Sequence, residues 1–156
     1  MKPLTITGIG PAYIGIITFL TILALALNQT NLLQATKSPA LHTAALIVSA
    51  IFILIGILLF FGALLHAKIV QNIKTNHLVT NGVYRFVRNP MYSGMLCCCT
   101  GLLITTTNWA FLPLPFLYWG LMTIMVKATE EKVLEEHFGN EYLSYKKRVN
   151  RCIPWF

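Results

Sequence analysis

The chain has 156 residues, of which 56% are hydrophobic and only 11% are charged, and its formal net charge is +7. Because ordinary globular proteins contain about 25% charged residues, a soluble domain of this length could not hide so much apolar surface. The positive charge would suit a nucleic-acid-binding protein, but the basic residues lie at the edges of apolar runs rather than along one polar face. Composition and charge therefore predict an all-α integral membrane protein, with one domain over residues 1–156 and no nucleic-acid partner.

Two uncharged apolar runs occupy most of the N-terminal part of the chain, at residues 9–27 and 41–65. Each is long enough to cross about 30 Å of hydrocarbon as a helix. The polar connection at 28–40 carries one lysine and is expected to be a loop. No basic segment with a small-residue cleavage site clearly precedes the first run, so we expect this run to be a retained span.

Residues 66–90 form a basic segment that contains turn signals. Asn81-Gly82 permits a tight turn, and Pro90 forces Asn89 away from helical geometry. Some backbone N–H and C=O groups between these positions should lack partners within the segment. At membrane depth such groups are tolerated only where something else, such as a cavity or a ligand, satisfies them. The segment is a candidate ligand site, with an ordinary interhelical loop as the alternative.

Two further apolar runs, at 91–107 and 109–126, are separated only by Asn108 and predict a tight helical hairpin. Each is just long enough to span, so we expect about four transmembrane helices. Three consecutive cysteines, Cys97 to Cys99, lie in the first of these runs. They point about 100° apart on a helix and cannot converge on one metal, so the sequence predicts neither a zinc site nor a disulfide framework.

The basic residues are distributed unequally between the two sides of such a four-span layout. The N-terminus, the 66–90 segment and the C-terminal tail would share one side, and every basic residue except Lys37 lies there. The positive-inside rule then places both polar segments in the cytoplasm, facing each other. This layout would suit a bacterial inner membrane or the endoplasmic reticulum.

The tail after the last apolar run carries every acidic residue of the chain and is not a span. Gly139 suits the end of one helix, and Asn140 suits the N-cap of a second. In the second helix Tyr142, Tyr145 and Val149 fall on one stripe. We expect that helix to lie along the membrane surface.

Glu130 and Glu131 directly follow the last apolar run. A carboxylate at the membrane edge is costly unless it has a partner, so both residues are functional candidates. The alternative is a salt-bridged face, with Lys127 and Glu131 at i,i+4. Adjacent residues point about 100° apart, so the two glutamates should have different roles, one directed inward and one outward.

The segment LVTNGVYRFVRNPMYSG, followed by TEEKVLEEHFGNEYLSYKKRV and a terminal IPW, resembles the isoprenylcysteine carboxyl methyltransferase family. The likeness covers roughly residues 66–156, including the VQN at 70–72, and the wider group includes phospholipid N-methyltransferases. The resemblance implies that S-adenosylmethionine is the cofactor. It also implies a cytoplasm-facing pocket that is roofed by the C-terminal helices.

The resemblance also implies site residues. The positions that would line the cofactor pocket are Gln71, His77, Leu78, Val79, Tyr84, Asn89, Pro90, Met91, Tyr92 and Glu130, with Glu131 as the fallback. The family usually has Arg-His-Pro where this chain has Arg88-Asn89-Pro90. Asparagine keeps a hydrogen-bonding group there but cannot be cationic or stack as an imidazole does. The family places a substrate-contacting arginine at the end of the last span, where this chain offers Lys127.

The chemistry of methyl transfer agrees with this assignment. The cofactor's ammonium group needs a carboxylate, which Glu130 can provide, and its adenine needs aromatic or apolar neighbours such as Tyr84 and Tyr92. A carboxylate acceptor is already ionised at pH 7, so catalysis would depend on alignment and on exclusion of water rather than on a base. A guanidinium suits capture of that carboxylate, with Arg148 the first candidate and Arg88 the second. The basic tail could equally contact lipid headgroups.

The sequence therefore predicts a membrane methyltransferase that acts on a lipid-like substrate, with the carboxylate of a prenylcysteine as the leading acceptor. A phospholipid amine is the first alternative, but an amine must lose a proton and none of the four histidines is obviously placed as a base. A sterol-type reductase that uses NADPH is the second, and the acidic Glu130-Glu131 pair disfavours such a phosphate-bearing cofactor. A non-catalytic membrane adaptor is the third. Oligomeric state is not predicted.

Overall fold

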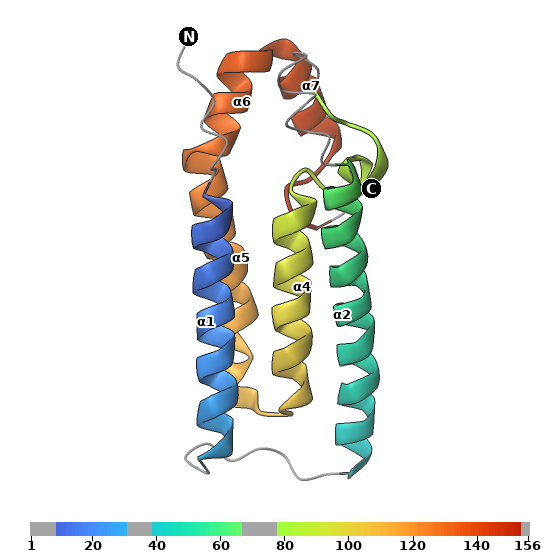
Figure 1. The fold of residues 1–156 in the computed structure, drawn as a ribbon, viewed down its shortest axis with the longest axis vertical. Helices are drawn as coiled ribbons and strands as arrows, with labels where there is room; N and C mark the ends of the chain where they lie inside the picture. Colours follow the sequence, from blue (N-terminus) through green and yellow to red (C-terminus); the bar gives the residue numbers. More distant parts are fainter. Residues whose placement is uncertain (1–8, 31–38, 67–77, 154–156) are drawn as a thin grey trace.

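The computed structural model describes residues 9–30, 39–66 and 78–153, and this part of the chain is entirely helical, with turns between the helices. The α-helices are α1 (Gly10–Gln29), α2 (Pro39–His66), α4 (Pro90–Thr105), α5 (Pro113–Ala128), α6 (Glu130–Phe138) and α7 (Asn140–Arg148). Two short 3₁₀ helices are η1 (Gly82–Arg85) and η2 (Trp109–Phe111). Helices α1, α2, α4 and α5 run side by side along the long axis, while α6 and α7 lie at one end of them (Figure 1).

The prediction of an all-helical membrane fold is confirmed, with a difference in the lengths of the spans. Three helical segments are long and apolar enough to cross a membrane, namely Gly10–Gln29, Leu41–Leu65 and Trp109–Phe138. The run predicted as the third span forms α4, a shorter apolar helix. Helix α5 begins at Pro113, since proline is tolerated at the first helical position, where its missing N–H would have no intrahelical partner.

The outer surface of the bundle has the apolar character that a lipid environment requires. Leu65 is 80% exposed and Phe116 is 71% exposed, and most side chains of α2 that face outward are large and hydrophobic. In a soluble monomer such a continuous apolar surface would be a liability. The exposed side chains agree with the composition in placing this chain in a membrane.

Helix α4 packs very closely against α2 through small residues. A Cβ atom added at Gly94 would lie 2.7 Å from the backbone oxygen of Gly56, and one added at Gly56 would lie 2.6 Å from the oxygen of Gly94. Further along the same interface the Ser49 hydroxyl donates a 2.8 Å hydrogen bond to the carbonyl of Gly101. Small residues let membrane helices approach closely where no hydrophobic effect drives them together. Through these contacts α2 holds the short helix α4 in place.

We expect Gly94→Ala to destabilise the protein, because the added methyl group would collide with the backbone of α2. Overpacking of this kind costs about 1–3 kcal/mol. Gly120→Ala is the matched control, since it also lies in a membrane helix but a Cβ there meets nothing within 4 Å. Thermal unfolding in detergent should show a lower midpoint for Gly94→Ala and an unchanged or higher midpoint for Gly120→Ala. Equal midpoints would contradict the close α2–α4 contact.

Polar groups between α1 and α5 satisfy one another inside the bundle. The Tyr13 hydroxyl donates to the carbonyl oxygen of Tyr118 at 3.3 Å, and the hydroxyls of Thr21 and Tyr118 lie 3.0 Å apart. At the end of the bundle far from α6, Asn108 donates to the side-chain oxygen of Asn28 at 3.0 Å. Its own side-chain oxygen accepts from the Ala110 amide at 3.0 Å, which starts η2. Asn108 therefore makes the tight turn that the sequence predicts between the last two apolar runs.

Candidate cofactor site

The segment from Asn81 to Pro90 lies at the end of the bundle that carries α6 and α7 (Figure 1). Gly82 has φ +60°, a conformation that favours glycine, and it starts η1 after the extended residue Asn81. Asn89 has φ −124° and ψ 66°, outside helical geometry, as expected for the residue before a proline. Pro90 is then the first residue of α4. The turn and the break predicted from the sequence are both confirmed.

Two amides of this segment are satisfied by the chain that follows α7. The Arg88 amide donates to the carbonyl of Asn150 at 2.8 Å, and the Asn89 amide donates to the carbonyl of Arg151 at 3.1 Å. Buried backbone donors require such partners. The sequence pointed to a cavity or a ligand as the partner of such groups. At these two positions the partner is protein backbone, which ties the C-terminal segment to the start of α4.

Glu130 lies beside two tyrosines. The Tyr92 hydroxyl donates a 2.5 Å hydrogen bond to Glu130 Oε1, and the backbone N–H of Ile9 also donates to this carboxylate. Burial, followed by the nearby negative charge of Glu130, raises the pKa of Tyr84 to about 12. Tyr92 and Glu130, both assigned from the sequence to the cofactor pocket, are thus in contact, and Tyr84 lies near enough to experience the charge of Glu130.

Glu131 has entirely different surroundings, because it is only 2% exposed and is surrounded by cations. Arg151 binds it in bidentate fashion, with Nε 2.7 Å from Oε1 and Nη2 3.0 Å from Oε2. Arg88 Nη1 lies 2.9 Å from Oε1, and Lys146 Nζ lies 3.3 Å from Oε2. A buried carboxylate requires such pairing. Through these ion pairs, Glu131 of α6 is joined to α7, to the segment just before α4 and to the C-terminal segment.

The alternative salt bridge between Lys127 and Glu131 is not formed. Among the described residues, the ion pairs of Glu131 go to Arg88, Lys146 and Arg151. The helix breaks between α5 and α6 at Thr129, whose φ and ψ are −129° and −74°. This break disrupts the i,i+4 spacing, and Lys127 is exposed at the end of α5.

The tyrosine stripe of α7 is directed towards protein. Tyr142 and Tyr145 are 2% and 4% exposed. The Tyr142 hydroxyl accepts a 3.1 Å hydrogen bond from Arg88 Nη1, and the Tyr145 hydroxyl donates a 2.6 Å hydrogen bond to the carbonyl of Tyr84. Tyr142 and Tyr145 form the predicted stripe, but Val149 is the extended residue that follows α7, and the two tyrosines face protein. The position of this helix along the membrane surface stays a prediction. Its tyrosines cover η1 and the start of α4.

The remaining predicted site residues fall into three groups. Those that are half-buried near η1 or in the first turn of α4 are Leu78, Val79 and Met91. Those that are exposed at helix ends are Lys127 and Arg148, and Arg148 Nε contacts the carbonyl of Ser144 in its own helix at 3.4 Å. Those that lie outside the described residues are Gln71 and His77. Three cations were predicted to capture a substrate. Of these, Arg88 is paired with Glu131, whereas Lys127 and Arg148 are exposed.

The sequence did not predict Arg151 and Lys146 as partners of Glu131. It also did not predict that the first turn of α1 lies near Glu130. The position of Glu130 and Glu131 at the membrane edge did indicate that these carboxylates would need partners. It did not indicate which bases would be used, because those pairings join residues far apart in the chain. No signal in the sequence pointed to Ile9 as a donor to Glu130.

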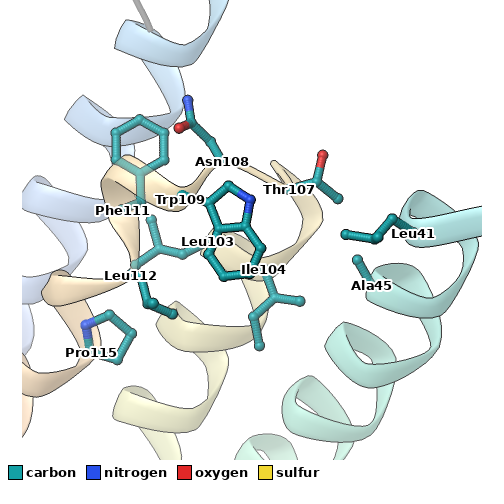
Figure 2. A pocket seen from close by; sticks show the side chains of 10 residues that line it. All are labelled: Leu41, Ala45, Leu103, Ile104, Thr107, Asn108, Trp109, Phe111, Leu112 and Pro115. Atoms are coloured by element: carbon teal, nitrogen blue, oxygen red, sulfur yellow. The ribbon is translucent and has the colours of Figure 1, made fainter. Parts of the chain in front are cut away.

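A pocket lies at the opposite end of the bundle, between the start of α2 and the α4–α5 turn (Figure 2). Its volume is about 180 Å³, and its lining is apolar apart from Thr107 and Asn108. It contains no carboxylate or cation, so it is unsuited to a charged cofactor. The candidate site is therefore the polar end around Glu130.

Comparison with known families gives a match over most of this architecture. Residues 40–141 match the family described as phospholipid methyltransferase. The matched range begins at the start of α2, earlier than the resemblance read from the sequence, and includes Tyr84, Tyr92, Glu130 and Glu131. It leaves out α1 and Arg151.

Individual relatives match a smaller part of the chain. Methanethiol S-methyltransferase 1 of Bradyrhizobium diazoefficiens is 34% identical over 94 residues, which cover 52% of this chain and 31% of that protein. The protein-S-isoprenylcysteine O-methyltransferase of Homo sapiens is 36% identical over 93 residues, covering 56% of this chain and 31% of the human protein. The enzyme of the same name from Schizosaccharomyces pombe is 33% identical over 82 residues, covering 52% and 34%. The matched part therefore spans about a third of each relative.

Proposed function

Because this multi-pass membrane chain belongs to the phospholipid methyltransferase family, we propose that it transfers a methyl group from S-adenosylmethionine to a lipid-like acceptor. The observation that carries the proposal is the Glu130 carboxylate, half-buried beside Tyr92 and Tyr84 within the family-matched range. The relatives include isoprenylcysteine O-methyltransferases and a methanethiol S-methyltransferase. Both kinds of relative are thus named as methyltransferases, although their acceptors differ.

The residues around Glu130 fit the chemical groups of this cofactor. A carboxylate offers about four lone-pair positions. Within the described part of the chain, Tyr92 and Ile9 each donate to the Glu130 carboxylate, which leaves capacity for the cofactor's ammonium group. The rings of Tyr84 and Tyr92 suit an adenine or a sulfonium, since aromatic faces attract both flat rings and cations. The cofactor, when bound, supplies the electrophilic methyl group.

Glu131 is poorly suited to bind that ammonium group, because three cations already surround it. Its role in the proposal is to hold Arg88 and Arg151, and with them the start of α4 and the C-terminal segment, around the site. Asn89, Pro90 and Met91 then contribute through the backbone and first turn of α4 rather than through a charge.

The proposed acceptor is the α-carboxylate of a prenylated cysteine, which is ionised at neutral pH and needs no base. Arg148, exposed at the end of α7, and Lys127, exposed at the end of α5, are the candidates to attract it. Arg88 is a further candidate through its Nε–H group, which is buried and has no hydrogen-bond partner among the described residues. A small thiol is the second acceptor class, in view of the methanethiol S-methyltransferase relative. A thiol must first lose its proton, since the thiolate is the nucleophile.

We infer a topology of four crossings, in which α4 crosses beside the three helical segments that are long and apolar enough to span. The start of α1, the end of α2, the start of α4 and the end of α5 all lie at the end that carries α6 and α7 (Figure 1). Most basic residues of the chain lie in the described segments at that end, so we infer that it faces the cytoplasm. A prenyl chain could then approach the site laterally from the lipid.

Titration of the purified protein in detergent with S-adenosylhomocysteine, the product form of the cofactor, tests the proposal. We expect binding in the micromolar range by calorimetry, and none of NADPH, because Glu130 would repel its phosphates. Binding of NADPH alone would favour a sterol-type reductase. Binding of neither by a folded sample would favour a non-catalytic adaptor.

Transfer of a labelled methyl group then distinguishes the acceptors. The protein should be offered a farnesylcysteine analogue, methanethiol and phosphatidylethanolamine separately. Product from the first alone supports carboxyl O-methylation. Product from either of the others, with none from the first, would overturn the assignment of the acceptor while leaving the cofactor assignment intact.

A further inference from the structure

The first turn of α1 packs directly on the Tyr92–Glu130 pair. A Cβ atom added at Gly10 would lie 2.8 Å from the hydroxyl oxygen of Tyr92 and 3.0 Å from its Cε1. That hydroxyl is the group that donates to Glu130. The absence of a side chain at Gly10 therefore decides how closely the backbone of α1 can approach the candidate site.

Two further contacts from the same turn reach both members of the pair. The N–H of Ile9, the N-cap residue of α1, donates to the Glu130 carboxylate. The ring of Tyr13, which is 2% exposed, meets the ring of Tyr92 edge to face with centroids 5.6 Å apart. The first N–H groups of a helix have no partner within the helix, and a negative charge near them is favourable. Burial is the larger effect and raises the pKa of Glu130, and the donor from this turn partly offsets it by favouring the ionised form.

We propose that this turn of α1 is a wall of the cofactor site and that Gly10 is a positioning residue, which sets the place of the Tyr92 ring and through it the Glu130 carboxylate. The inference rests on the proposed function, since it assumes that Glu130 binds the cofactor. It extends the site to a helix outside the family-matched range of residues 40–141. The chain's own N-terminal helix would then contribute to cofactor affinity.

The experiment compares Gly10→Ala with Gly15→Ala in the full chain in detergent. Both substitutions add one methyl group to α1, but a Cβ at Gly15 meets nothing within 4 Å. Both substitutions replace a glycine of the same helix by alanine, and only the one at Gly10 meets Tyr92. We expect Gly10→Ala to weaken S-adenosylhomocysteine binding about tenfold or more. The added methyl group would displace the Tyr92 ring, and with it the Glu130 carboxylate that we assign to the ligand. Gly15→Ala should bind as the unmodified protein does.

A double substitution separates positioning from general damage. In the Tyr92→Phe background the nearest atom that Gly10→Ala would strike is gone and the ring is no longer bonded to Glu130, so adding Gly10→Ala should cost less affinity than it does alone. Equal affinities of Gly10→Ala and Gly15→Ala, or full additivity with Tyr92→Phe, would overturn the proposal.

A measurement without ligand keeps the inference distinct from the proposed function. Hydrogen exchange of the Ile9 and Tyr13 amides should be faster in Gly10→Ala than in Gly15→Ala, because α1 must move away from Tyr92. If the unmodified protein fails to bind S-adenosylhomocysteine, the proposed function fails. If it binds but exchange and affinity are the same in the two variants, only the role of α1 fails.

Discussion

Glu130→Ala is expected to abolish measurable S-adenosylhomocysteine binding while the protein remains folded. The substitution removes the carboxylate that we assign to the ligand's ammonium group. Loss of one partner of a buried ion pair costs about 3–5 kcal/mol, which corresponds to roughly a hundred- to several-thousandfold in affinity. The fold should tolerate the change because Glu130 is half-buried and its described contacts are the hydrogen bonds from Tyr92 and Ile9. Calorimetry for binding, with thermal unfolding for the fold, gives both readouts.

Glu136→Ala is the matched control for this experiment. Glu136 lies in the same helix, α6, but is exposed, so its removal changes the net charge equally without touching the site. Its affinity should stay within about twofold of the unmodified protein, since exposed charges interact weakly. Normal ligand binding by Glu130→Ala would show that this carboxylate does not bind the ligand. The observation on which the proposed function depends would then be lost.

Local signals in the sequence were sufficient to predict the helices and the turns. The uncharged runs gave α1, α2 and α5 with ends that differ by a few residues, and Asn81-Gly82 and Asn89-Pro90 marked the turn and the break before α4. These features depend on residues adjacent in the chain, through backbone geometry and apolar length. The neighbourhood of Tyr84, Tyr92 and Glu130 came from the family resemblance rather than from such signals.

Contacts between distant segments could not be predicted in this way. The choice of Arg151 as the bidentate partner of Glu131 depends on how the chain after α7 returns to the start of α4. The role of Gly10 depends on the approach of two helices, which apolar composition alone does not determine. The stripe of Tyr142 and Tyr145 was visible, but a protein-facing stripe and a membrane-facing stripe have the same helical spacing.

Glu131→Ala is expected to have the opposite consequence to Glu130→Ala, although the two residues are adjacent. It would leave Arg88 and Arg151, whose side chains are 6% and 16% exposed, without the carboxylate that neutralises them. Uncompensated buried charge of this kind costs about 3–5 kcal/mol, a large part of the stability of a small domain. Thermal unfolding in detergent should therefore show a large fall in the midpoint, and ligand binding should be lost together with the fold.

Glu135→Ala calibrates this loss, because Glu135 pairs only with Lys146 among the described ion pairs, and both side chains are about one-third exposed. Such a pair contributes about 1 kcal/mol or less, so this variant should unfold close to the unmodified protein. The two adjacent glutamates thus divide their roles by the direction in which each points from α6. Glu131 faces the cations that join the C-terminal segment to α4, and Glu130 faces the tyrosines. A Glu131→Ala protein as stable as Glu135→Ala would contradict this division, because the ion pairs around Glu131 would then contribute no more than a pair at the surface.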